Sequence, residues 1–323
     1  MSLIERLADR LIREGQLQHL ALRVGCGSEL LAECYRNADE KTLFDMASVT
    51  KILSVTQLML MALEEGKITL ETVVKNRWTV RQLMTHTIGI GHRNLCQPTV
   101  NDENIAAYIA SLEEEIPAGS NVLYSCPAFI LLGKVLEELY GERLDVLFRQ
   151  RVALPLGMRE SCFLPTRRQN VVNANKTEEE LGLVNDYNCR YLGGVAGNAG
   201  VFSCVEELTL FCRMLLREGE PLYKKELFRS AAENHTKGMD AARGLGYLYV
   251  DERYPQTGRL FPVGSIGHCG HTGQMLFVHP QSGLYAIVLT DATRHAKQYS
   301  DVMKLRELIC NTVAEELYEN RIY

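Results

Sequence analysis

Two polar side chains that could act together stand just before a long apolar segment. Ser48 and Lys51 are three residues apart, and the run from Ile52 to Leu63 has the composition of a buried helix. Residues three apart lie on one face of a helix, so the Lys51 ammonium can reach the Ser48 hydroxyl and assist its deprotonation. A lysine in the first turn also opposes the helix dipole, by up to about 1 kcal/mol. The position is unfavourable unless the lysine is used, so the pair predicts a nucleophilic serine.

A structural interpretation of the same pair stays open. Serine is a common N-cap, and a first-turn lysine can extend its ammonium into solvent. A chain of this length shows about one Ser-x-x-Lys by chance. The motif occurs once here, at the start of the apolar helix. Spacing alone therefore makes Ser48 and Lys51 candidates, and other parts of the chain must supply their partners.

The composition indicates a chain with a large core. Of 323 residues, 46% are hydrophobic and 23% are charged, which suffices for one large domain or two closely packed ones. The net charge is −5 and the basic residues are dispersed, so we expect no nucleic-acid partner. The N-terminal segment is charged throughout and lacks the apolar core of a secretory signal. The run from Ile52 to Leu63 is too short for a bilayer, so no membrane span is expected.

Ten cysteines are spread along the chain without a metal-binding pattern. They form no Cys-x-x-Cys pair and no His/Cys cluster with zinc spacing, so we expect neither a metal nor an organic cofactor. Without a signal segment, these cysteines predict free thiols in a reducing cytoplasm. Export of a longer precursor remains an alternative, and the oligomeric state is left open.

The order of the elements predicts an α+β fold. A helix near the N-terminus is followed by strand candidates at 17–27 and 29–36, and more strands precede a final helix over about 299–318. We expect one central antiparallel sheet built from both ends of the chain, flanked by the N- and C-terminal helices, with a largely helical inserted region. The predicted division is 1–69 plus 241–323 for the sheet region and 70–240 for the helical region, with the active site at their interface.

Five further segments, together with Ser48 and Lys51, carry a resemblance to a known family. They are TVRQLMTHTIGI at 79–90, VLYSCPAFILLGKVLEELYG at 122–141, PLGMRESCF at 155–163, LGGVAGNAGVFS at 192–203, and GHCGHTGQMLFVHPQSGLYAIVLT at 267–290. With these motifs, over most of its length, the chain resembles the serine β-lactamase and penicillin-binding-protein-like family, especially its class C and esterase-like branch. The resemblance implies a β-lactamase/transpeptidase-like fold and a serine nucleophile in the Ser-x-x-Lys motif.

The second motif of that family, Tyr-x-Asn, has several candidates. Literal matches begin at Tyr35 and Tyr318, whereas the Tyr-Ser-Cys at 124–126 lacks the asparagine. Tyr35 precedes the nucleophile and Tyr318 lies in the terminal helix, so neither has the family's position. Tyr124 lies shortly before Pro127, which favours the first turn of a following helix. We therefore predict Tyr124 as the second catalytic residue; the alternative is a tyrosine that packs its ring into the core.

Tyr124 and Lys51 would share the removal of the Ser48 proton. Free phenol and ammonium groups have pKa values of about 10, too high for a base at neutral pH. One or both pKa values must then be lowered by burial and proximity. A charged Lys51 would favour a Tyr124 phenolate, whereas a desolvated neutral Lys51 could itself accept the Ser48 proton. The sequence does not choose between these two bases.

The third family motif is Lys-Thr-Gly or His-x-Gly on a strand that lines the site. HTG at 271–273 is a literal match, but the register of the downstream strand pair indicates HCG at 268–270 instead. In that register the backbone N–H groups of Ser48 and His271 form the oxyanion hole, where one donor contributes about 3 kcal/mol. His268 would face the substrate or the phenol; the alternative is a structural histidine that fills a strand face.

Three departures from the family pattern affect the substrate. Cys126 replaces an asparagine that would hold a substrate amide, Cys269 replaces a hydroxyl residue, and His268 replaces a charged lysine. We expect Cys126, Cys269 and Gly270 to border the substrate, with fewer contacts to the amide and carboxylate of a penicillin-like molecule. Asp186 resembles an aspartate of another family segment, and we assign it a structural or substrate-lining role.

These motifs predict a serine hydrolase that acts through an acyl-enzyme on Ser48. The expected substrate is a small molecule or short peptide with an ester or amide bond. Esterase or small-amide hydrolase activity ranks above β-lactamase activity, and D,D-peptidase activity ranks lower for a cytoplasmic protein. The alternative from another class is a ligand-binding or sensor protein with a weakened site. The missing asparagine and the missing middle hydroxyl favour that alternative, and the retention of Ser48, Lys51 and Tyr124 disfavours it.

Overall fold

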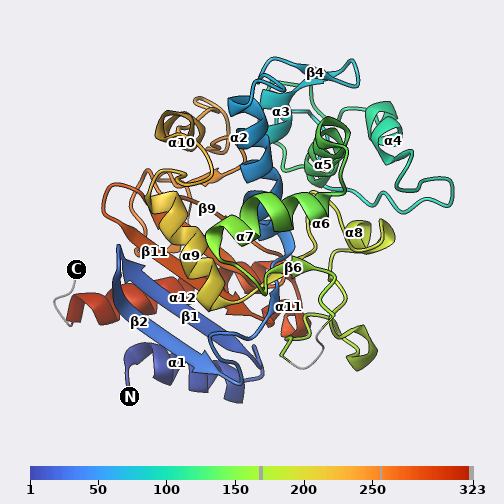
Figure 1. Cartoon of the computed structure of the whole chain (residues 1–323). Coiled ribbons are helices and arrows are strands. Elements are labelled where there is room, and N and C mark those ends of the chain that lie inside the picture. The colour runs from blue at the N-terminus through green and yellow to red at the C-terminus, as the bar shows by residue number, and fades with distance from the viewer. Residues whose placement is uncertain (167–169, 255–256, 320–323) are drawn as a thin grey trace.

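The computed structural model describes residues 1–166, 170–254 and 257–319, and a six-stranded antiparallel sheet lies at its centre (Figure 1). The strand order is β2-β1-β11-β10-β9-β8. The strands are β1 (Leu20–Cys26), β2 (Glu29–Arg36), β8 (Leu248–Tyr249), β9 (Ile266–Cys269), β10 (Met275–His279) and β11 (Leu284–Thr290). In the register of β1 with β11, Leu20 lies opposite Thr290 and Cys26 opposite Leu284. Both ends of the chain therefore build one sheet, which confirms the predicted fold class.

The central strands separate two hydrophobic cores, because alternate side chains of a strand point to opposite faces. In β11, Leu284, Ala286 and Val288 belong to the core beneath the terminal helices. Ile287 and Leu289 belong to the core beneath the helical region. Every residue of β11 is buried. Burial on both faces explains why this strand is apolar throughout instead of alternating with polar residues.

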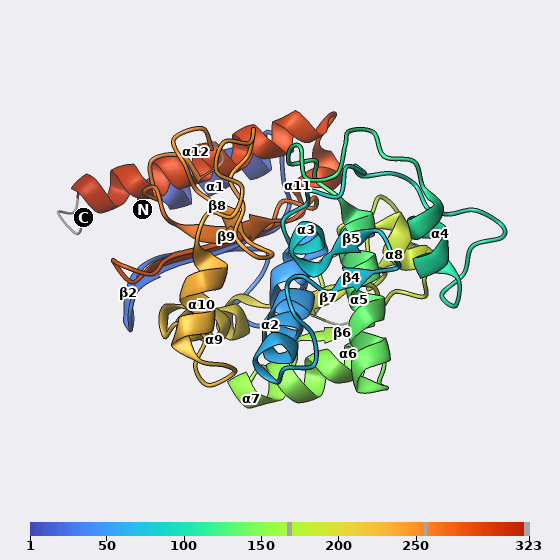
Figure 2. The ribbon, with the colours of Figure 1, turned by 90° about the horizontal axis from the view of Figure 1, so that it is seen from above.

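Helices α1 (Leu3–Arg13) and α12 (Tyr299–Glu319) lie together on one face of the sheet (Figure 2). A capping box starts α1: Ser2 Oγ accepts a hydrogen bond from Glu5 N at 3.2 Å, and Ser2 N donates to the Glu5 carboxylate at 2.9 Å. The apolar sides of both helices join the core under the sheet. The terminal helices predicted from apolar spacing are thus confirmed.

The helical region covers the opposite face, where α9 (Val205–Leu216) packs on β10 and β11. The other helices are α2 (Thr56–Glu64), α3 (Val80–Met84), α4 (Ile105–Ser111), α5 (Cys126–Tyr140), α6 (Leu144–Leu147), α7 (Leu154–Leu156), α8 (Tyr187–Tyr191), α10 (Lys225–Ala232) and α11 (Ala292–His295). Two small sheets complete this region: β3 (Phe44–Asp45), β7 (Val201–Ser203) and β6 (Cys162–Phe163) form one, and β4 (Val73–Val74) and β5 (Trp78–Thr79) form the other.

The chain after β3 runs through the middle of the molecule as three helical pieces. A 3₁₀ turn (Ala47–Val49) is followed by a π-helical segment (Lys51–Val55) and then by α2. The sequence predicted one continuous helix from Ser48, whereas the structure has three consecutive helical segments. Neighbouring elements hold the turn in this shape, and the local sequence does not reveal them. π-helical turns occur frequently at functional sites. The helix ends as expected, with Gly66 at φ +68°, a conformation that glycine adopts without steric penalty.

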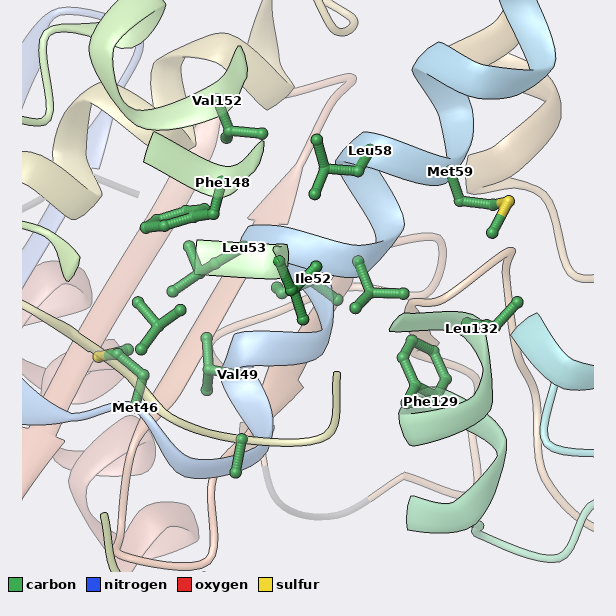
Figure 3. Close-up of a cluster of buried hydrophobic side chains, with 14 of the residues drawn as sticks. Met46, Val49, Ile52, Leu53, Leu58, Met59, Phe129, Leu132, Phe148 and Val152 are labelled. Atoms are coloured by element: carbon green, nitrogen blue, oxygen red, sulfur yellow. The ribbon is translucent and has the colours of Figure 1, made fainter. Parts of the chain in front are cut away.

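The central helix is buried on all sides (Figure 3). Its apolar residues pack with side chains of neighbouring elements, among them Met46, Phe129, Leu132, Phe148 and Val152. Within the described ranges, Ala47–Glu64 is the single helical stretch that is long and apolar enough to cross a membrane. It is longer than the apolar run from Ile52 to Leu63, which was predicted from the sequence to be too short for a bilayer. Because 83% of it is buried inside the protein, it is the core helix of this fold.

The Ser48 turn lies where the sheet meets the helical region. This turn contacts β9, and the π-helical segment after it contacts α5. Helix α2 also packs against α5 and α10, although it falls in the part of the sequence assigned to the sheet region. The boundaries near residues 70 and 240 stay a prediction.

Candidate active site

Ser48 lies in the 3₁₀ turn at the start of the central helix. Lys51 Nζ donates a hydrogen bond to Ser48 Oγ at 3.0 Å, and the Tyr124 hydroxyl donates to the same oxygen at 2.7 Å. Two groups able to hold or transfer a proton therefore meet at one hydroxyl. The fold brings together the three residues predicted to act as one unit, although Tyr124 is 76 positions from Ser48 in the chain. Their catalytic roles stay a prediction.

A buried carboxylate holds the turn that presents Ser48. Asp45 accepts hydrogen bonds from the backbone N–H groups of Ala47 at 2.8 Å and Asn185 at 2.6 Å. Ala47 has φ +44°, in the left-handed region that non-glycine residues rarely adopt. Such a conformation persists only where the surroundings enforce it. Burial raises the pKa of Asp45 to about 6.

Lys51 is completely buried, so the interpretation of a lysine that extends into solvent is wrong. Its ammonium also donates to the carbonyl oxygen of Asn198 at 2.9 Å and lies 3.6 Å from Cys126 Sγ. The Phe129 ring centroid lies 5.7 Å from Nζ. These contacts supply the partners that a buried charge requires, and they hold the ammonium beside Ser48.

The start of α5 positions Tyr124. Ser125 is the N-cap: its Oγ accepts a hydrogen bond from Ala128 N at 3.2 Å, and its own N–H donates to His86 Nδ1 at 3.0 Å. The His86 ring lies 4.7 Å from the Tyr124 ring, centroid to centroid. The helix cap and the histidine therefore fix the direction in which the phenol points.

The two literal matches to the Tyr-x-Asn motif lie elsewhere. The hydroxyl of Tyr35, on the edge strand β2, donates to Glu33 at 3.1 Å. Tyr318 is 77% exposed near the end of α12. Of the three candidates, Tyr124 is the one that contacts Ser48. Its place before a helix was a better criterion than the presence of an asparagine.

The protonation states differ from the expectation. Burial raises the pKa of Tyr124 to about 12, against the attraction of Lys51. Burial lowers the pKa of Lys51, but attraction from Cys126 and Tyr124 outweighs it and leaves that pKa above its usual value. The expected lowering of one or both pKa values is therefore wrong for the free protein, because burial penalises the phenolate while the neighbours stabilise the ammonium. At neutral pH the resting site holds a neutral phenol and a charged lysine.

Strand β9 and the turn after it border the site with different residues. Thr272 Oγ1 and Gln274 Nε2 are buried and donate to the Asp45 carbonyl oxygen at 3.0 and 2.7 Å. The literal match at 271–273 therefore anchors this turn to the segment that precedes the nucleophile. The triplet at 268–270 instead ends the strand that borders the site, which is the arrangement that the chosen register requires.

His268 is buried beside Tyr124, with 6.0 Å between the ring centroids. Its Nδ1 lies 2.7 Å from the carbonyl oxygen of Cys269, so this nitrogen carries the proton and donates it. Its Nε2 has no hydrogen-bond partner in the described part of the chain. Burial lowers the pKa of His268 well below its usual value. A neutral imidazole with a free acceptor in the pocket wall suits contact with a substrate better than contact with the phenol.

The remaining predicted residues occupy different places. Cys126 and Cys269 line the pocket beside Ser48, whereas Gly270 does not. A Cβ on Gly270 would lie 2.7 Å from the Met46 carbonyl oxygen, so glycine lets the strand end approach the nucleophile turn. The backbone N–H of His271 makes no hydrogen bond within the described ranges, and it is free to bind an oxyanion. The oxyanion pair stays a prediction.

A cavity of about 480 Å³ opens beside Ser48. Its wall includes Tyr124, Cys126, Asn185, Asp186, Arg243, Tyr254, His268, Cys269 and His271. Asp186 also caps α8, where its Oδ1 accepts from Cys189 N at 2.8 Å, so it has both a structural and a lining place. A cavity of this size suits a small molecule or a short peptide.

The described residues contain no group of three or more His, Cys, Asp or Glu side chains arranged to hold a metal ion. All ten cysteines are free thiols.

Three residues that shape the site were missed from the sequence. His86 bonds the N-cap of α5, and Asn198 binds Lys51 through its backbone carbonyl. Arg243 places its guanidinium 5.6 Å from the Tyr124 ring centroid. His86 and Asn198 lie in segments that carry the family resemblance, which was their only signal. Arg243 lies outside those segments and had none.

Comparisons with known sequences identify the family of the chain. The family model described as Beta-lactamase matches residues 5–306. A protein of Salmonella typhimurium, provisionally named D-alanyl-D-alanine carboxypeptidase, is 24% identical over 316 residues. That alignment covers 81% of this chain and 72% of the relative.

Several solved structures share the fold. A β-lactamase (Mb2281c) from Mycobacterium bovis has a TM-score of 0.70 and 22% identity, with 96% of this chain and 99% of that one covered. An octameric penicillin-binding protein homologue from Pyrococcus abyssi has a TM-score of 0.74 and 19% identity, covering 99% and 80%. EstCE1, a hydrolase with promiscuous acyltransferase activity, has a TM-score of 0.76 and 19% identity, covering 94% and 97%. At these identities the structures show a common fold and leave the substrate open.

Proposed function

Because the chain belongs to the Beta-lactamase family, we propose that it is a serine hydrolase that forms an acyl-enzyme on Ser48. The observation that carries this proposal is the convergence of Tyr124 and Lys51 on Ser48 Oγ, at 2.7 and 3.0 Å. The proposed substrates are small molecules or short peptides with an ester or amide bond, and no metal or organic cofactor takes part.

Acylation begins when Ser48 Oγ attacks the carbonyl carbon of the substrate. The hydroxyl proton passes to the Tyr124–Lys51 pair in the minor form of the pair that has already lost one proton to solvent, because the neutral phenol and charged lysine of the resting site cannot accept another. The backbone N–H groups of Ser48 and His271 are the proposed donors to the oxyanion. The pair then returns the proton to the leaving alcohol or amine as the C–O or C–N bond breaks.

Deacylation repeats these steps with water as the nucleophile. Water attacks the ester carbonyl on Ser48, and its proton passes to the same pair. Collapse of the intermediate breaks the bond to Ser48 Oγ, which regains a proton, and the product leaves as a carboxylic acid. One proton-transfer unit therefore serves both halves of the reaction, which is consistent with the buried and fully partnered Lys51.

Esters and small amides rank above β-lactams as substrates. Cys126 offers a weaker hydrogen-bonding group than the asparagine of the family motif, so a substrate amide gains less from this position. Activated esters need no such contact. The name of the Salmonella relative makes D-alanyl-D-alanine peptides a second substrate class to test.

A fluorophosphonate probe tests the nucleophile directly. We expect it to label the purified protein and to fail with Ser48→Ala. A panel of p-nitrophenyl esters, D-amino-acid amides, D-Ala-D-Ala peptides and a chromogenic cephalosporin then ranks the substrates by kcat/KM. A cephalosporin with a higher kcat/KM than every ester would reverse the ranking. Absence of both labelling and turnover would favour the alternative of a ligand-binding or sensor protein.

A further inference from the structure

Arg243 is a buried arginine in the pocket wall. The residue is only 8% exposed. Within the described ranges, Nε and Nη1 are buried and make no hydrogen bond. The guanidinium faces the ring of Tyr124, with 5.6 Å from its carbon to the ring centroid. The group therefore lies beside the proposed reaction centre with Nε and Nη1 unused in the described part of the chain.

The backbone fixes the place of this side chain. Arg243 N donates to Thr236 Oγ1 at 2.9 Å, and its carbonyl oxygen accepts from His235 N at 2.7 Å. The next residue is also held, since Gly244 N donates to the Tyr247 carbonyl oxygen at 3.0 Å. The guanidinium is thus presented to the pocket by an ordered turn.

The surroundings of Arg243 do not neutralise its charge. The groups that act on it electrostatically are Tyr124, Tyr254 and Cys269, and none of these is a carboxylate. Burial lowers the pKa of Arg243, but a guanidinium remains protonated in proteins. Asp186, the carboxylate in the pocket wall, acts on Lys51 instead. A buried cation without a counter-charge is unfavourable, and an anionic ligand would relieve it.

We propose that Arg243 binds a carboxylate group of the substrate and makes this protein selective for anionic esters or amides. This inference rests on the proposed hydrolase function and specifies its substrate class. A guanidinium matches a carboxylate with two parallel hydrogen bonds, which fixes orientation as well as affinity. Arg243 would supply the carboxylate recognition that His268, a neutral imidazole, does not.

The position of Arg243 also limits where the carboxylate lies. The guanidinium faces the ring whose hydroxyl contacts Ser48 Oγ, so the bound carboxylate lies within a few bonds of the reacting carbonyl. The carboxylate can belong to the leaving group or to the acyl group. Both arrangements present the same chemistry to Arg243, and matched substrates distinguish them.

Two pairs of substrates test the proposal. The first pair, 3-carboxyphenyl acetate and 3-carbamoylphenyl acetate, places the acid on the leaving group. The second pair, the p-nitrophenyl monoester of glutaric acid and the same ester of glutaric acid monoamide, places it on the acyl group. With the unmodified protein we expect at least one acid to exceed its amide in kcat/KM by about 10- to 100-fold, the range for a charge-assisted contact.

Arg243→Gln should abolish that preference, and Arg243→Lys should retain part of it. The matched control is Arg229→Gln, which should keep the full preference, because Arg229 is an exposed arginine on α10 that pairs with Glu218. The proposal is overturned if the unmodified protein prefers neither acid, or if the preference survives in Arg243→Gln. It is also overturned if Arg243→Gln slows acid and amide equally, since Arg243 would then act only on Tyr124.

A binding measurement separates this proposal from the proposed function. Glutarate should raise the melting temperature of Ser48→Ala, and the rise should vanish in Ser48→Ala/Arg243→Gln. That result supports the carboxylate site even if no substrate is hydrolysed. Hydrolysis of neutral esters without any glutarate effect in Ser48→Ala would support the enzyme and overturn the carboxylate site.

Discussion

Lys51 and Arg243 are two buried cations beside the same phenol, and their surroundings differ sharply. Each lies against the Tyr124 ring, at 5.0 Å for Lys51 Nζ and 5.6 Å for the Arg243 guanidinium carbon. Lys51 has hydrogen-bond partners on several elements, including Ser48 Oγ and the Asn198 carbonyl. Arg243 Nε and Nη1 have none in the described part of the chain.

The difference separates two tasks within one pocket. A cation whose partners are all supplied by the protein is already in place when the reaction starts, so no reorganisation is needed. A cation without partners gains them only when a ligand arrives. The surroundings of Lys51 are thus completed by folding, whereas those of Arg243 are completed by an anionic substrate under the inference above.

The largest expected effect comes from substituting Lys51 or the two residues that act with it. We expect kcat/KM for an activated ester to fall by about 10³-fold or more in each of Ser48→Ala, Lys51→Ala and Tyr124→Phe. Double variants should be little slower than the single variants. The reason is that the three groups share one proton transfer. Steady-state kinetics on single and double variants, with the exposed Ser28→Ala as control, measure this. Near-normal activity in both Lys51→Ala and Tyr124→Phe would refute the assignment.

The pH dependence of activity tests the protonation state of the Tyr124–Lys51 pair. The reactive form of the Tyr124–Lys51 pair lacks one proton, and the pKa values of both groups lie above their ordinary values. The reactive fraction therefore grows as pH rises, by about tenfold per pH unit below the apparent pKa. We expect kcat/KM for a neutral ester to rise steadily from pH 6 to pH 9, after subtraction of the rate with Ser48→Ala. A plateau across this range would mean that a base is already formed near neutrality.

Stability measurements compare the two cations directly. Lys51→Met leaves the Asn198 carbonyl without its Lys51 donor and removes one of the two donors to Ser48 Oγ, so the free energy of unfolding should fall by about 1–3 kcal/mol. Arg243→Met removes an unpaired buried charge, so the free energy of unfolding should stay unchanged or rise by about 1 kcal/mol. Urea denaturation with linear extrapolation measures both variants. An equal loss in the two variants would show that Arg243 has internal partners after all.

The smallest expected effect concerns the thiol next to Lys51. Burial raises the pKa of Cys126, but the attraction of Lys51 and a hydrogen bond with His92 outweigh it, so the pKa is lowered. Burial raises the pKa of Cys212, which lies in the core. Iodoacetamide should modify Cys126 or Cys269 in the native protein several-fold faster than Cys212, since thiolate is the reactive form.

Acylation of Ser48 before the thiol reagent should protect the pocket cysteines, and peptide mass spectrometry quantifies each site. The predicted register gains independent support if either Cys126 or Cys269 is protected. It loses that support if neither is modified, or if modification is the same with a free and an acylated Ser48.

Local patterns were sufficient for several parts of the fold and the site. The three-residue spacing of Ser48 and Lys51 predicted their contact, which is 3.0 Å in the structure. The apolar run of β11 and the spacing of the terminal helices predicted a sheet built from both ends of the chain. Pro127 after a tyrosine indicated a loop entering a helix, and that criterion selected Tyr124, whose hydroxyl contacts Ser48 Oγ, over the literal motif matches. These signals are short-range, so they can be read from neighbouring residues.

Other features had no local signal. The π-helical turn at Lys51, the complete burial of its ammonium and the raised pKa values all depend on elements that pack around the turn. A first-turn lysine is compatible with solvent exposure in isolation. Only the Asn198 carbonyl and the α5 segment, both distant in sequence, make burial possible.

The sequence by itself determined that Ser48 and Lys51 lie together, the class of fold and the order of the family motifs, because helix and strand periodicity and short motifs are encoded locally. The tertiary structure alone decided that the Lys51 ammonium is completely buried with a partner from a distant segment, and that Arg243 enters the pocket with Nε and Nη1 unpaired in the described part of the chain. The physical reason is that the state of a buried charge depends on its partners and its desolvation, and these come from segments far apart in the chain.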